Sequence, residues 1–298
     1  MMNFSSEIKT FYEDRLDIIY SNDSLVRQIF GTPIGIKQNE KDRAAFEKTF
    51  RAYLEEAALT VSLIENETLT QSDPLLEVGG GIGMTYIFLQ HKGYNIISIE
   101  PSDSGFNDYY ATGKEFCVTL NTDTSNWLPL LGEETLSLGK KFKYIFSNNV
   151  LEHIPKIEST FDALKQVMSE DGQMIHNTVN YIIPYEPHFG IVLFPFFPKL
   201  TTLFKPKLKH SDMWNGLNFI TTRKVRKMCR RLDMNVNFEN KTMYNTFLRI
   251  KNDKEFAKRQ RYFVPVVKVL DTLRLLNSFK YFPADLVTPM KFTIKHKK

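Results

Sequence analysis

A glycine-rich segment, Gly79-Gly80-Gly81-Ile82-Gly83, directly follows the apolar run 75–78. The next residues, 84–89, have the composition of a helix, and a second apolar run, 96–99, leads to Glu100. A strand, a glycine loop, a helix and a second strand ending in an acid form the nucleotide-binding unit of a parallel sheet. Glycine lets the backbone turn sharply and approach a ligand, and the helix N-terminus offers it unpaired N–H groups. We therefore expect a nucleoside-type ligand at this loop, with Glu100 accepting hydrogen bonds from its ribose.

The spacing of the glycines distinguishes two classes of ligand. A dinucleotide-binding loop has the order G-x-G-x-x-G, which would require glycine at Met84 if counted from Gly79, or at Ile82 if counted from Gly80. The order that fits is E-x-G-x-G-x-G, with Glu77, Gly79, Gly81 and Gly83. This pattern resembles motif I of the class I S-adenosylmethionine-dependent methyltransferases and argues against a dehydrogenase. The alternative is a flexible glycine loop without a ligand.

A second segment, 146–155, carries the same resemblance. It contains Val-Leu-Glu-His-Ile-Pro and resembles the fourth-strand motif of a methyltransferase subgroup that includes quinone-biosynthesis and other small-molecule enzymes. Residues 167–173 are similar to the turn before the family's fifth strand. Residues 178–181 are similar to the end of that strand, with valine in place of a proline, and residues 283–295 to the last strand. The resemblance implies methyl transfer from S-adenosylmethionine and says little about the acceptor.

Apolar runs and helical periodicity alternate along the central part of the chain. The predicted strands are 75–78, 96–100, 116–120, 143–147 and 173–179, and the predicted helices are 82–91, 103–112, 125–131 and 157–169. Outside this part, we predict helices at 5–30, 42–64, 221–232 and 250–280, and strands at 235–241 and 290–295. Alternation of this kind predicts a mostly parallel sheet whose strand C-termini share one ligand-binding edge.

The fold class is therefore α/β. The resemblance implies a doubly wound, mostly parallel seven-stranded sheet of the Rossmann-like methyltransferase type, with N-terminal helices and a helical, aromatic lid. We divide the chain into an N-terminal helical cap (1–70), an S-adenosylmethionine-binding core (71–181), a lid or substrate segment (182–220) and a C-terminal part of the sheet (221–298) with a helical insertion at about 250–285.

The composition limits the remaining classes of protein. The chain has 298 residues, which is enough for one α/β domain with additions. Its net charge is +5. Its two cysteines, Cys117 in a predicted strand and Cys229 in a predicted helix, cannot form a disulfide framework, and we predict both to be buried. The sequence predicts neither a signal peptide nor a membrane span. We expect a cytoplasmic protein that does not bind DNA.

The resemblance also implies roles for individual residues toward the cofactor, S-adenosyl-L-methionine. The implied cofactor-binding residues are Glu77, Gly79, Gly80, Gly81, Gly83, Glu100, Asn121, Asp123 and Asn148. The glycine backbone would pack against the methionine moiety, and Glu77 would act through the loop and the amino group. Asn121 and Asp123 follow the predicted third strand, where the family contacts adenine. Asn148 would face the methionine group, or would simply be a turn residue at a strand end.

His153 is the candidate catalytic residue, as a base near the methyl acceptor. The alternative is a histidine that packs at a helix start and orders the loop. Some small-RNA 2′-O-methyltransferases bind a divalent metal with an E-x-x-E-H version of this motif. Here Asn149 replaces the first acid and is a poor ligand for a hard cation, so we predict no metal. A site built from Glu152, His153 and His188 is the alternative left open.

The proline- and aromatic-rich segment after Tyr181 is expected to select the acceptor. It leaves the fifth strand at the ligand edge, and its composition suits a small apolar or aromatic molecule. Our candidate substrate residues are Tyr181, Tyr185, His188 and Trp214. The alternative is a packed subdomain without ligand contact. Together with the apolar helix 266–279, the segment also suggests peripheral contact with a membrane.

The sequence favours a small-molecule methyltransferase. One rival is an RNA methyltransferase, suggested by the basic helix 223–231 and the pI near 8.9, but that helix lacks interleaved aromatic residues, and basic outer faces are usually solvated. The other rival is a non-catalytic binding module that keeps the methyltransferase fold. The sequence does not indicate the acceptor, the methylated atom or the oligomeric state.

Overall fold

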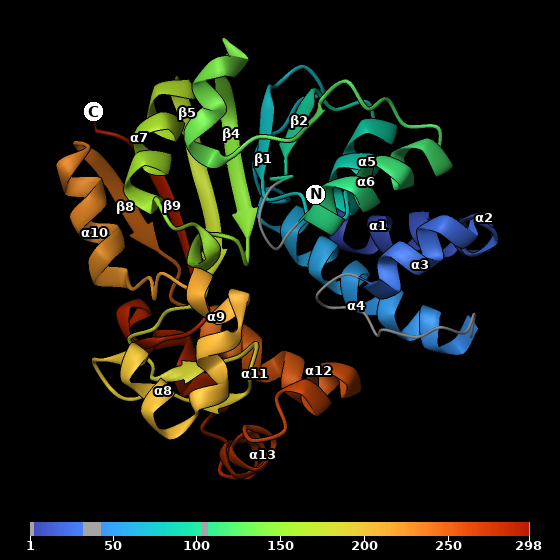
Figure 1. Cartoon of the computed structure of the whole chain (residues 1–298). Coiled ribbons are helices and arrows are strands. Elements are labelled where there is room, and N and C mark those ends of the chain that lie inside the picture. Colours follow the sequence, from blue (N-terminus) through green and yellow to red (C-terminus); the bar gives the residue numbers. More distant parts are fainter. Residues whose placement is uncertain (1–2, 32–42, 103–106, 298) are drawn as a thin grey trace. The chain divides into compact units, whose positions relative to one another are not determined.

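The computed structural model describes residues 3–31, 43–102 and 107–297, and its central feature is a seven-stranded sheet (Figure 1). The strand order is β3-β2-β1-β4-β5-β9-β8. The strands are β1 Leu75–Val78, β2 Ile96–Ile99, β3 Trp127–Leu128, β4 Phe142–Asn148, β5 Met168–Thr178, β8 Met234–Phe238 and β9 Met290–His296. β1 is parallel to both β2 and β4, and β2 is parallel to β3. The predicted α/β class with a seven-stranded, mostly parallel sheet is confirmed.

The chain divides into two compact units. The first comprises Met1–Val150, Lys156–His176 and Lys295–Lys298, and the second comprises Leu151–Pro155 and Asn177–Ile294. The glycine loop and Glu100 belong to the first unit. His153 and the predicted acceptor residues belong to the second.

Most helices of the first unit pack around a shared aromatic core. They are α1 Phe4–Glu13, α2 Leu16–Ser21, α3 Asp23–Gly31, α4 Arg43–Ser62, α5 Met84–His91 and α6 Asn107–Thr119, whereas α7 Ile157–Val167 packs against the 3-10 helix Gly132–Leu138. Figure 1 shows α1 to α4 beside α5 and α6. Tyr12 of α1 packs against Phe50 and Phe116, and its hydroxyl donates to the Met84 carbonyl at 2.7 Å. The N-terminal helices therefore support the start of α5, the helix that follows the glycine loop.

The predicted helix 5–30 is three helices. Asn22 separates the second from the third, because its Oδ1 accepts a hydrogen bond from Leu25 N and so caps α3. Its Nδ2 donates to Glu115 and Thr119 of α6 at 2.9 and 2.8 Å. A periodic apolar pattern does not reveal this break, since the pattern continues across it.

The region between β2 and β4 differs from the prediction. The predicted strand 116–120 lies mainly in α6, and the predicted helix 125–131 contains β3 and leads into a 3-10 helix, Gly132–Leu138. Phe116 and Cys117 are buried on the face of α6. A short apolar run does not distinguish a buried helix from a strand. The Trp127 ring stacks on Tyr110, and its Nε1 donates to the Tyr110 carbonyl, which fixes the two-residue strand β3.

The second unit begins with short elements. They are the 3-10 helix Leu151–His153, β6 Tyr185–Glu186, β7 Ile191–Val192, the 3-10 helix Pro198–Leu200, α8 Thr201–Phe204, the 3-10 helix Pro206–His210 and α9 Asp212–Gly216. β6 and β7 pair antiparallel, with Tyr185 opposite Val192. Because each element is only two to five residues long, the segment shows no periodicity in the sequence.

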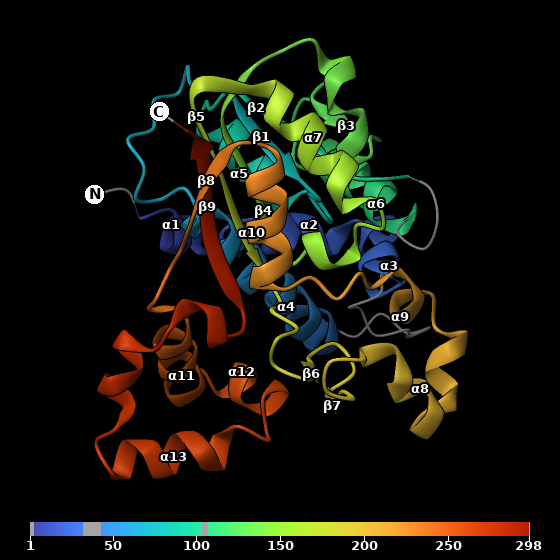
Figure 2. The same ribbon diagram turned by 90° about the vertical axis from the view of Figure 1, so that its left-hand side faces the viewer.

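The C-terminal helices follow the prediction more closely. α10, Thr222–Arg231, begins where Thr221 accepts a hydrogen bond from Lys224 N, and it buries Cys229 as predicted. The helices that follow are α11 Thr242–Asn252, α12 Lys254–Arg259 and α13 Val264–Thr272, with 3-10 helices Leu276–Tyr281 and Ala284–Leu286. α11, α13 and the 3-10 helix Leu276–Tyr281 share a small apolar core, and α11 to α13 are grouped together in Figure 2. Within the described ranges, no helix has the length and apolar character needed to cross a membrane.

Candidate functional site

The glycine loop lies where the sequence predicts it, between β1 and α5. β1 pairs with β2 so that Glu77 is opposite Ser98. The N–H groups of Gly79 and Gly80 donate to the Ile99 carbonyl at 2.8 and 3.1 Å. These bonds hold the loop against the end of β2. The loop therefore starts at the carboxyl end of β1, the edge at which parallel sheets bind ligands.

The glycines of this loop are required for different reasons. A Cβ atom at Gly80 would lie 2.3 Å from Ser98 Oγ and 2.5 Å from the Trp127 ring, so this position has no room for a side chain. A Cβ atom at Gly81 would meet nothing within 4 Å. The φ of 59° at Gly81 favours glycine for conformational reasons alone. The backbone at Gly81 therefore borders open space, where a ligand can approach it.

Glu100 follows β2 and turns its side chain to the glycine loop. Its Oε2 accepts a hydrogen bond from Gly81 N at 2.8 Å, and the residue is 5% exposed. Burial raises the pKa of Glu100 to about 8; the Gly81 N–H opposes this rise and the nearby Glu77 adds to it. The carboxyl group predicted to bind ribose is thus held next to the open side of the loop.

Glu77 is buried in β1 and connects the elements around the loop. Its Oε2 accepts a hydrogen bond from Ser98 Oγ of β2 at 2.7 Å. Burial raises its pKa to about 7, while hydrogen bonds from Ser98 and from Thr85, in the first turn of α5, oppose the rise. Glu77 therefore contacts β2 and α5, the elements beside the loop, which is consistent with an indirect role toward the ligand, exerted through the loop.

Asn121 and Asp123 do not follow the third strand, because β3 begins only at Trp127. Asn121 has a φ of 52° in the turn after α6. Asp123 Oδ1 accepts a hydrogen bond from Ser125 N at 2.9 Å, and the hydrogen bonds from Ser125 lower the pKa of Asp123. The positional reason for an adenine contact is therefore wrong, and the contact itself stays a prediction.

Asn148, at the end of β4, is directed to α4. Its Nδ2 lies 3.3 Å from the Glu56 carbonyl oxygen, and Asn149 Nδ2 donates to Glu56 Oε2 at 2.8 Å. Glu56 is not among the residues that the sequence predicts for the site. In the sequence, Glu56 is only an acidic residue within a predicted helix of apolar periodicity. The structure adds this carboxylate, from the N-terminal helices, to the residues around the end of β4.

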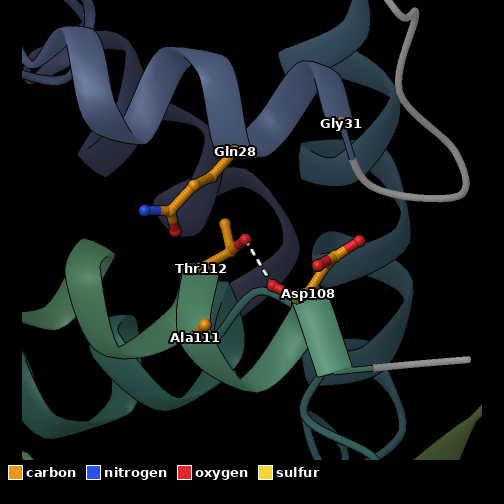
Figure 3. Close-up of a pocket in the computed structure, with 5 residues that line it drawn as sticks. All are labelled: Gln28, Gly31, Asp108, Ala111 and Thr112. Carbon is orange, nitrogen blue, oxygen red and sulfur yellow. Dashed lines mark hydrogen bonds between the residues drawn. The ribbon is translucent and has the colours of Figure 1, made fainter. Parts of the chain in front are cut away.

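A separate cavity of about 150 Å³ lies between α3 and α6 (Figure 3). It is lined by Gln28, Gly31, Asp108, Ala111 and Thr112, and the Thr112 hydroxyl donates to the Asp108 carbonyl. No predicted cofactor residue lines it. Its volume is below the roughly 300–1,000 Å³ typical of small-molecule sites. This cavity is therefore not the predicted cofactor pocket.

The predicted acceptor residues belong to the second unit, where two of them meet at Glu186. The buried Glu186 Oε1 accepts from His188 Nδ1 at 2.6 Å and from the Tyr181 hydroxyl at 3.3 Å, and its Oε2 accepts from Phe189 N at 2.7 Å. Burial alone would raise the pKa of Glu186, but the hydrogen bonds from His188 and Phe189 outweigh it and lower that pKa. Glu186 was not among the predicted residues, although its spacing from His188 was a usable signal.

The other two acceptor candidates lie in aromatic contacts. The buried Trp214 packs edge-on against Phe189 and Phe219, at centroid distances of 6.0 and 5.4 Å. Tyr181 packs on the same Phe219 at 5.1 Å. Tyr185, in contrast, is directed to Phe263, at 5.4 Å. The structure therefore brings Tyr181, His188 and Trp214 into one connected cluster and turns Tyr185 toward the C-terminal helices.

His153 lies in the 3-10 helix Leu151–His153, which Asn218 holds in place. Asn218 Nδ2 donates to the carbonyl oxygens of Leu151 and Ile154 at 2.6 and 2.9 Å. The His153 ring lies 4.9 Å from the His188 ring, at an interplanar angle of 66°. Burial lowers the pKa of His153 to about 3, with His188 adding to this effect and Glu186 opposing it. His153 is therefore a neutral imidazole beside a second histidine, and Asn218 is a supporting residue that the sequence did not indicate.

Two uncharacterized proteins of Mycobacterium tuberculosis, Rv1509 and MT1557, are each 29% identical to this chain over 222 residues. The aligned part covers 71% of this chain and 75% of each relative. Their similarity extends beyond the glycine loop but does not indicate an activity.

Two methyltransferases are among the similar solved structures. The plantazolicin methyltransferase BamL, in complex with a triazolic desmethylPZN analog and S-adenosylhomocysteine, has a TM-score of 0.50 and 11% identity over 95% of this chain and 99% of its own. The Haemonchus contortus phosphoethanolamine N-methyltransferase 2 has a TM-score of 0.46 and 13% identity over 96% of this chain, which spans 59% of that protein.

A family model described as a methyltransferase domain matches residues 46–236. The match begins within α4, so the helix that carries Glu56 is part of the family's domain. It also includes the glycine loop, Glu100 and His153. With the strand order and the geometry of the loop, this match identifies the chain as a member of the methyltransferase-domain family, a class I S-adenosylmethionine-dependent methyltransferase.

Proposed function

We propose that this enzyme transfers the methyl group of S-adenosylmethionine to a small acceptor of apolar or aromatic character. Methyl transfer from a sulfonium is a direct displacement, in which the acceptor atom forms a bond to the methyl carbon as the carbon–sulfur bond breaks. The protein aligns the two reactants and excludes water, and such alignment is worth roughly 7–11 kcal/mol in favourable cases. The donor therefore needs a rigid cradle, and the acceptor needs its own ordered residues.

For the donor, we propose that Glu100 binds the ribose hydroxyls and that the backbone at Gly79 to Gly83 packs against the methionine moiety. The hydrogen bond between Glu100 and Gly81 N, with open space at Gly81, supports this assignment. Glu77 would hold the loop, Asp123 and Asn121 would contact adenine, and Asn148 would contribute at the methionine end.

For the acceptor, we propose the cluster around Glu186. The observation that carries this proposal is the set of three hydrogen bonds that converge on the buried Glu186 from His188, Tyr181 and Phe189. They orient His188 in a cluster that also includes Tyr181, through the shared Glu186, and Trp214, through its contact with Phe189. His153 and His188 present imidazole nitrogens that can take the acceptor's proton or hold the acceptor atom. An apolar wall with a few fixed polar groups suits a small aromatic molecule.

The acceptor class is tested by measuring S-adenosylhomocysteine formation with a panel of acceptors. We expect turnover with a hydroquinone or catechol and little with phosphoethanolamine or structured RNA. Turnover confined to RNA or to phosphoethanolamine would contradict the proposed acceptor class. It would leave the methyltransferase activity itself in place.

The basic face of α10, which suggests the RNA alternative, gives that alternative little support. Two of its cations already have partners within the second unit. Arg226 pairs with Asp285 at 2.9 Å and lies over the Phe238 ring, and Lys224 Nζ donates to the Asn218 carbonyl at 2.7 Å. Binding to RNA through this face would weaken steeply as salt increases.

We also propose that residues 192–204, here called the apolar fringe, contact an anionic lipid surface. Exposed large apolar side chains share this segment: Val192, Phe194, Phe196, Phe197, Leu200, Leu203 and Phe204. Phe196 is 93% exposed and has a φ of 63°, a backbone conformation that few residues other than glycine adopt. Lysines at 199, 205, 207 and 209 supply positive charge beside them. Apolar side chains edged by cations are characteristic of interfacial membrane binding.

Flotation with phosphatidylglycerol-containing vesicles tests this contact. The double change of Phe196 and Phe204 to serine is expected to lower vesicle partitioning at least about tenfold, because burying one such side chain is worth about 1.5–3 kcal/mol. Val118→Ser on α6, also at an exposed apolar residue, serves as the matched control and should change little. If the unmodified protein does not float with the vesicles, or if the double variant floats equally well, the lipid contact is refuted.

A further inference from the structure

We propose that Glu152, His153 and His188 form a binding site for a divalent transition-metal ion. Each residue offers one ligand atom, and these three atoms all lie within 4.8 Å of one another. All three residues belong to the second unit, where Glu152 and His153 come from one 3-10 helix and His188 from the loop between β6 and β7. Two imidazoles and one carboxylate are a donor set that holds first-row transition metals.

Glu152 supplies the first observation that points to a cation. Its side chain is completely buried, and its Oε2 accepts a hydrogen bond from Thr178 Oγ1 at 2.6 Å. Its Oε1 is also buried and has no hydrogen-bond partner among the residues that the structure describes. Burying a carboxylate oxygen without a partner is costly, because the oxygen loses its contact with water. A cation at the centre of the cluster would satisfy this oxygen.

His188 supplies the second observation. Its Nδ1 lies 2.6 Å from Glu186 Oε1 and donates to it in the tautomer that this pair favours. The lone pair of His188 is then on Nε2. A histidine that ligates a metal usually donates its other ring N–H to a carboxylate or a carbonyl, which fixes the ring and its tautomer. Glu186 is itself fixed by Tyr181 and Phe189, so the orientation of His188 is set in advance.

The spacing of the ligand atoms suits coordination after small side-chain rotations. Bonds of 2.0–2.1 Å in a tetrahedral site place ligand atoms about 3.3 Å apart, compared with the present limit of 4.8 Å. Asn218 already holds the turn that carries Glu152 and His153. The two imidazole rings meet at 66°, so they are not stacked face to face. Three protein ligands leave a coordination position for an oxygen or nitrogen of a small molecule.

The sequence argues against a metal because Asn149 replaces an acid of a known motif. The proposed site does not use that position, since the Asn149 side chain donates to Glu56 in the first unit. Mixed imidazole and carboxylate ligands favour zinc, cobalt, iron or manganese over magnesium or calcium, which prefer oxygen ligands alone. We therefore expect ions of the zinc and cobalt type to bind. This inference does not depend on the proposed acceptor.

Titration of the full-length, EDTA-treated protein with Co²⁺, followed by visible absorption, tests the site. Calorimetry with Zn²⁺ gives a second measurement of the same affinity. We expect one ion per chain, and at least about 100-fold weaker binding in His188→Gln, because one of three protein ligands is lost. Glu186→Gln keeps all three ligands and should weaken binding about 10- to 100-fold through the orientation of His188. The matched control is His210→Gln, an exposed histidine of the same unit, which should bind the ion as the unmodified protein does.

Calorimetry with S-adenosylhomocysteine on the same preparations reports whether the fold and the donor site are intact. Glu152→Gln is a second ligand variant of nearly unchanged size, for use where His188→Gln is poorly folded. The metal site is refuted if the unmodified protein binds no stoichiometric Co²⁺ or Zn²⁺. It is also refuted if folded ligand variants bind these ions as tightly as His210→Gln. If the unmodified protein binds S-adenosylhomocysteine but no metal ion, only the metal site is refuted. If it does not bind S-adenosylhomocysteine, the donor assignment is refuted.

Discussion

Replacing Glu100 with alanine is expected to weaken the binding of S-adenosylhomocysteine by about 1–3 kcal/mol, roughly 5- to 150-fold in Kd. The change removes the carboxylate that we assign to the ribose hydroxyls and also the hydrogen bond that Gly81 N donates at 2.8 Å. Calorimetric titration measures the effect. Glu134→Ala, at an acidic residue in the 3-10 helix Gly132–Leu138 outside the loop, serves as the control and should leave Kd unchanged. An unaltered Kd in Glu100→Ala would mean that the ribose binds elsewhere.

The pH dependence of the same titration identifies the charge of Glu100 as the cause. Burial raises the pKa of Glu100 to about 8 in the unliganded protein, so the group must lose its proton before it can accept two hydrogen bonds. Affinity should therefore be fully present above this pKa and should fall as pH decreases through it. Each pH unit well below the pKa lowers affinity by up to about tenfold, and the fall between pH 8.0 and pH 6.5 is up to about 16-fold because half of the Glu100 carboxyl groups are already protonated at pH 8.0. Glu100→Gln cannot ionise and should lack this slope, even though Glu77 titrates in both proteins. Parallel pH profiles for the two proteins would exclude the carboxylate as the titrating group.

Replacing His153 with glutamine is expected to lower kcat by at least about tenfold, because the change removes an imidazole that lies beside His188 in the cluster assigned to the acceptor. Binding of S-adenosylhomocysteine should remain within about twofold of the unmodified protein, because His153 is not among the residues that we assign to the donor. Initial rates at saturating donor and acceptor give kcat. His210→Gln again provides the control, and its kcat should be unchanged. If kcat falls by less than about tenfold, His153 only packs within its turn and has no catalytic role.

The pH profile of the unmodified enzyme constrains how His153 acts. Burial lowers its pKa to about 3, so its imidazole is neutral throughout the range from pH 5 to pH 9. Titration of His153 should therefore add no inflection to the rate in this range. If EDTA lowers the rate and Zn²⁺ or Co²⁺ then restores it, we interpret His153 as a metal ligand. If EDTA has no effect on the rate, the imidazole acts directly on the acceptor.

The donor side could be predicted from the sequence because its geometry is local. The strand, glycine loop and helix are consecutive, and only glycine fits at Gly80, beside Ser98 and Trp127. Glu100 follows the next strand of a parallel sheet, so its proximity to the loop depends only on the pairing of β1 with β2. The third strand was misassigned because Phe116 and Cys117 form a buried helical face that resembles a short strand. This error also removed the positional basis for the adenine contact.

The rest of the candidate site depends on contacts between residues that are distant in the sequence. The contact between Glu56 and Asn149 joins residues 93 positions apart, and Asn218 reaches back 67 positions to Leu151. Periodicity and turn propensity contain no information about such pairs. Within the segment after Tyr181, elements of two to five residues are too short for a pattern. Glu186 could have been found from its spacing to His188, but its role as a shared acceptor required the structure.

A crystal structure with S-adenosylhomocysteine bound is the most direct test of the claim that Glu100 and the glycine loop hold the donor. Our account predicts that both ribose hydroxyls lie about 2.5–3.0 Å from the Glu100 carboxylate oxygens. It also predicts that the homocysteine chain lies against the backbone at Gly81. A nucleoside bound elsewhere, with Glu100 making no contact to the ribose, would contradict it.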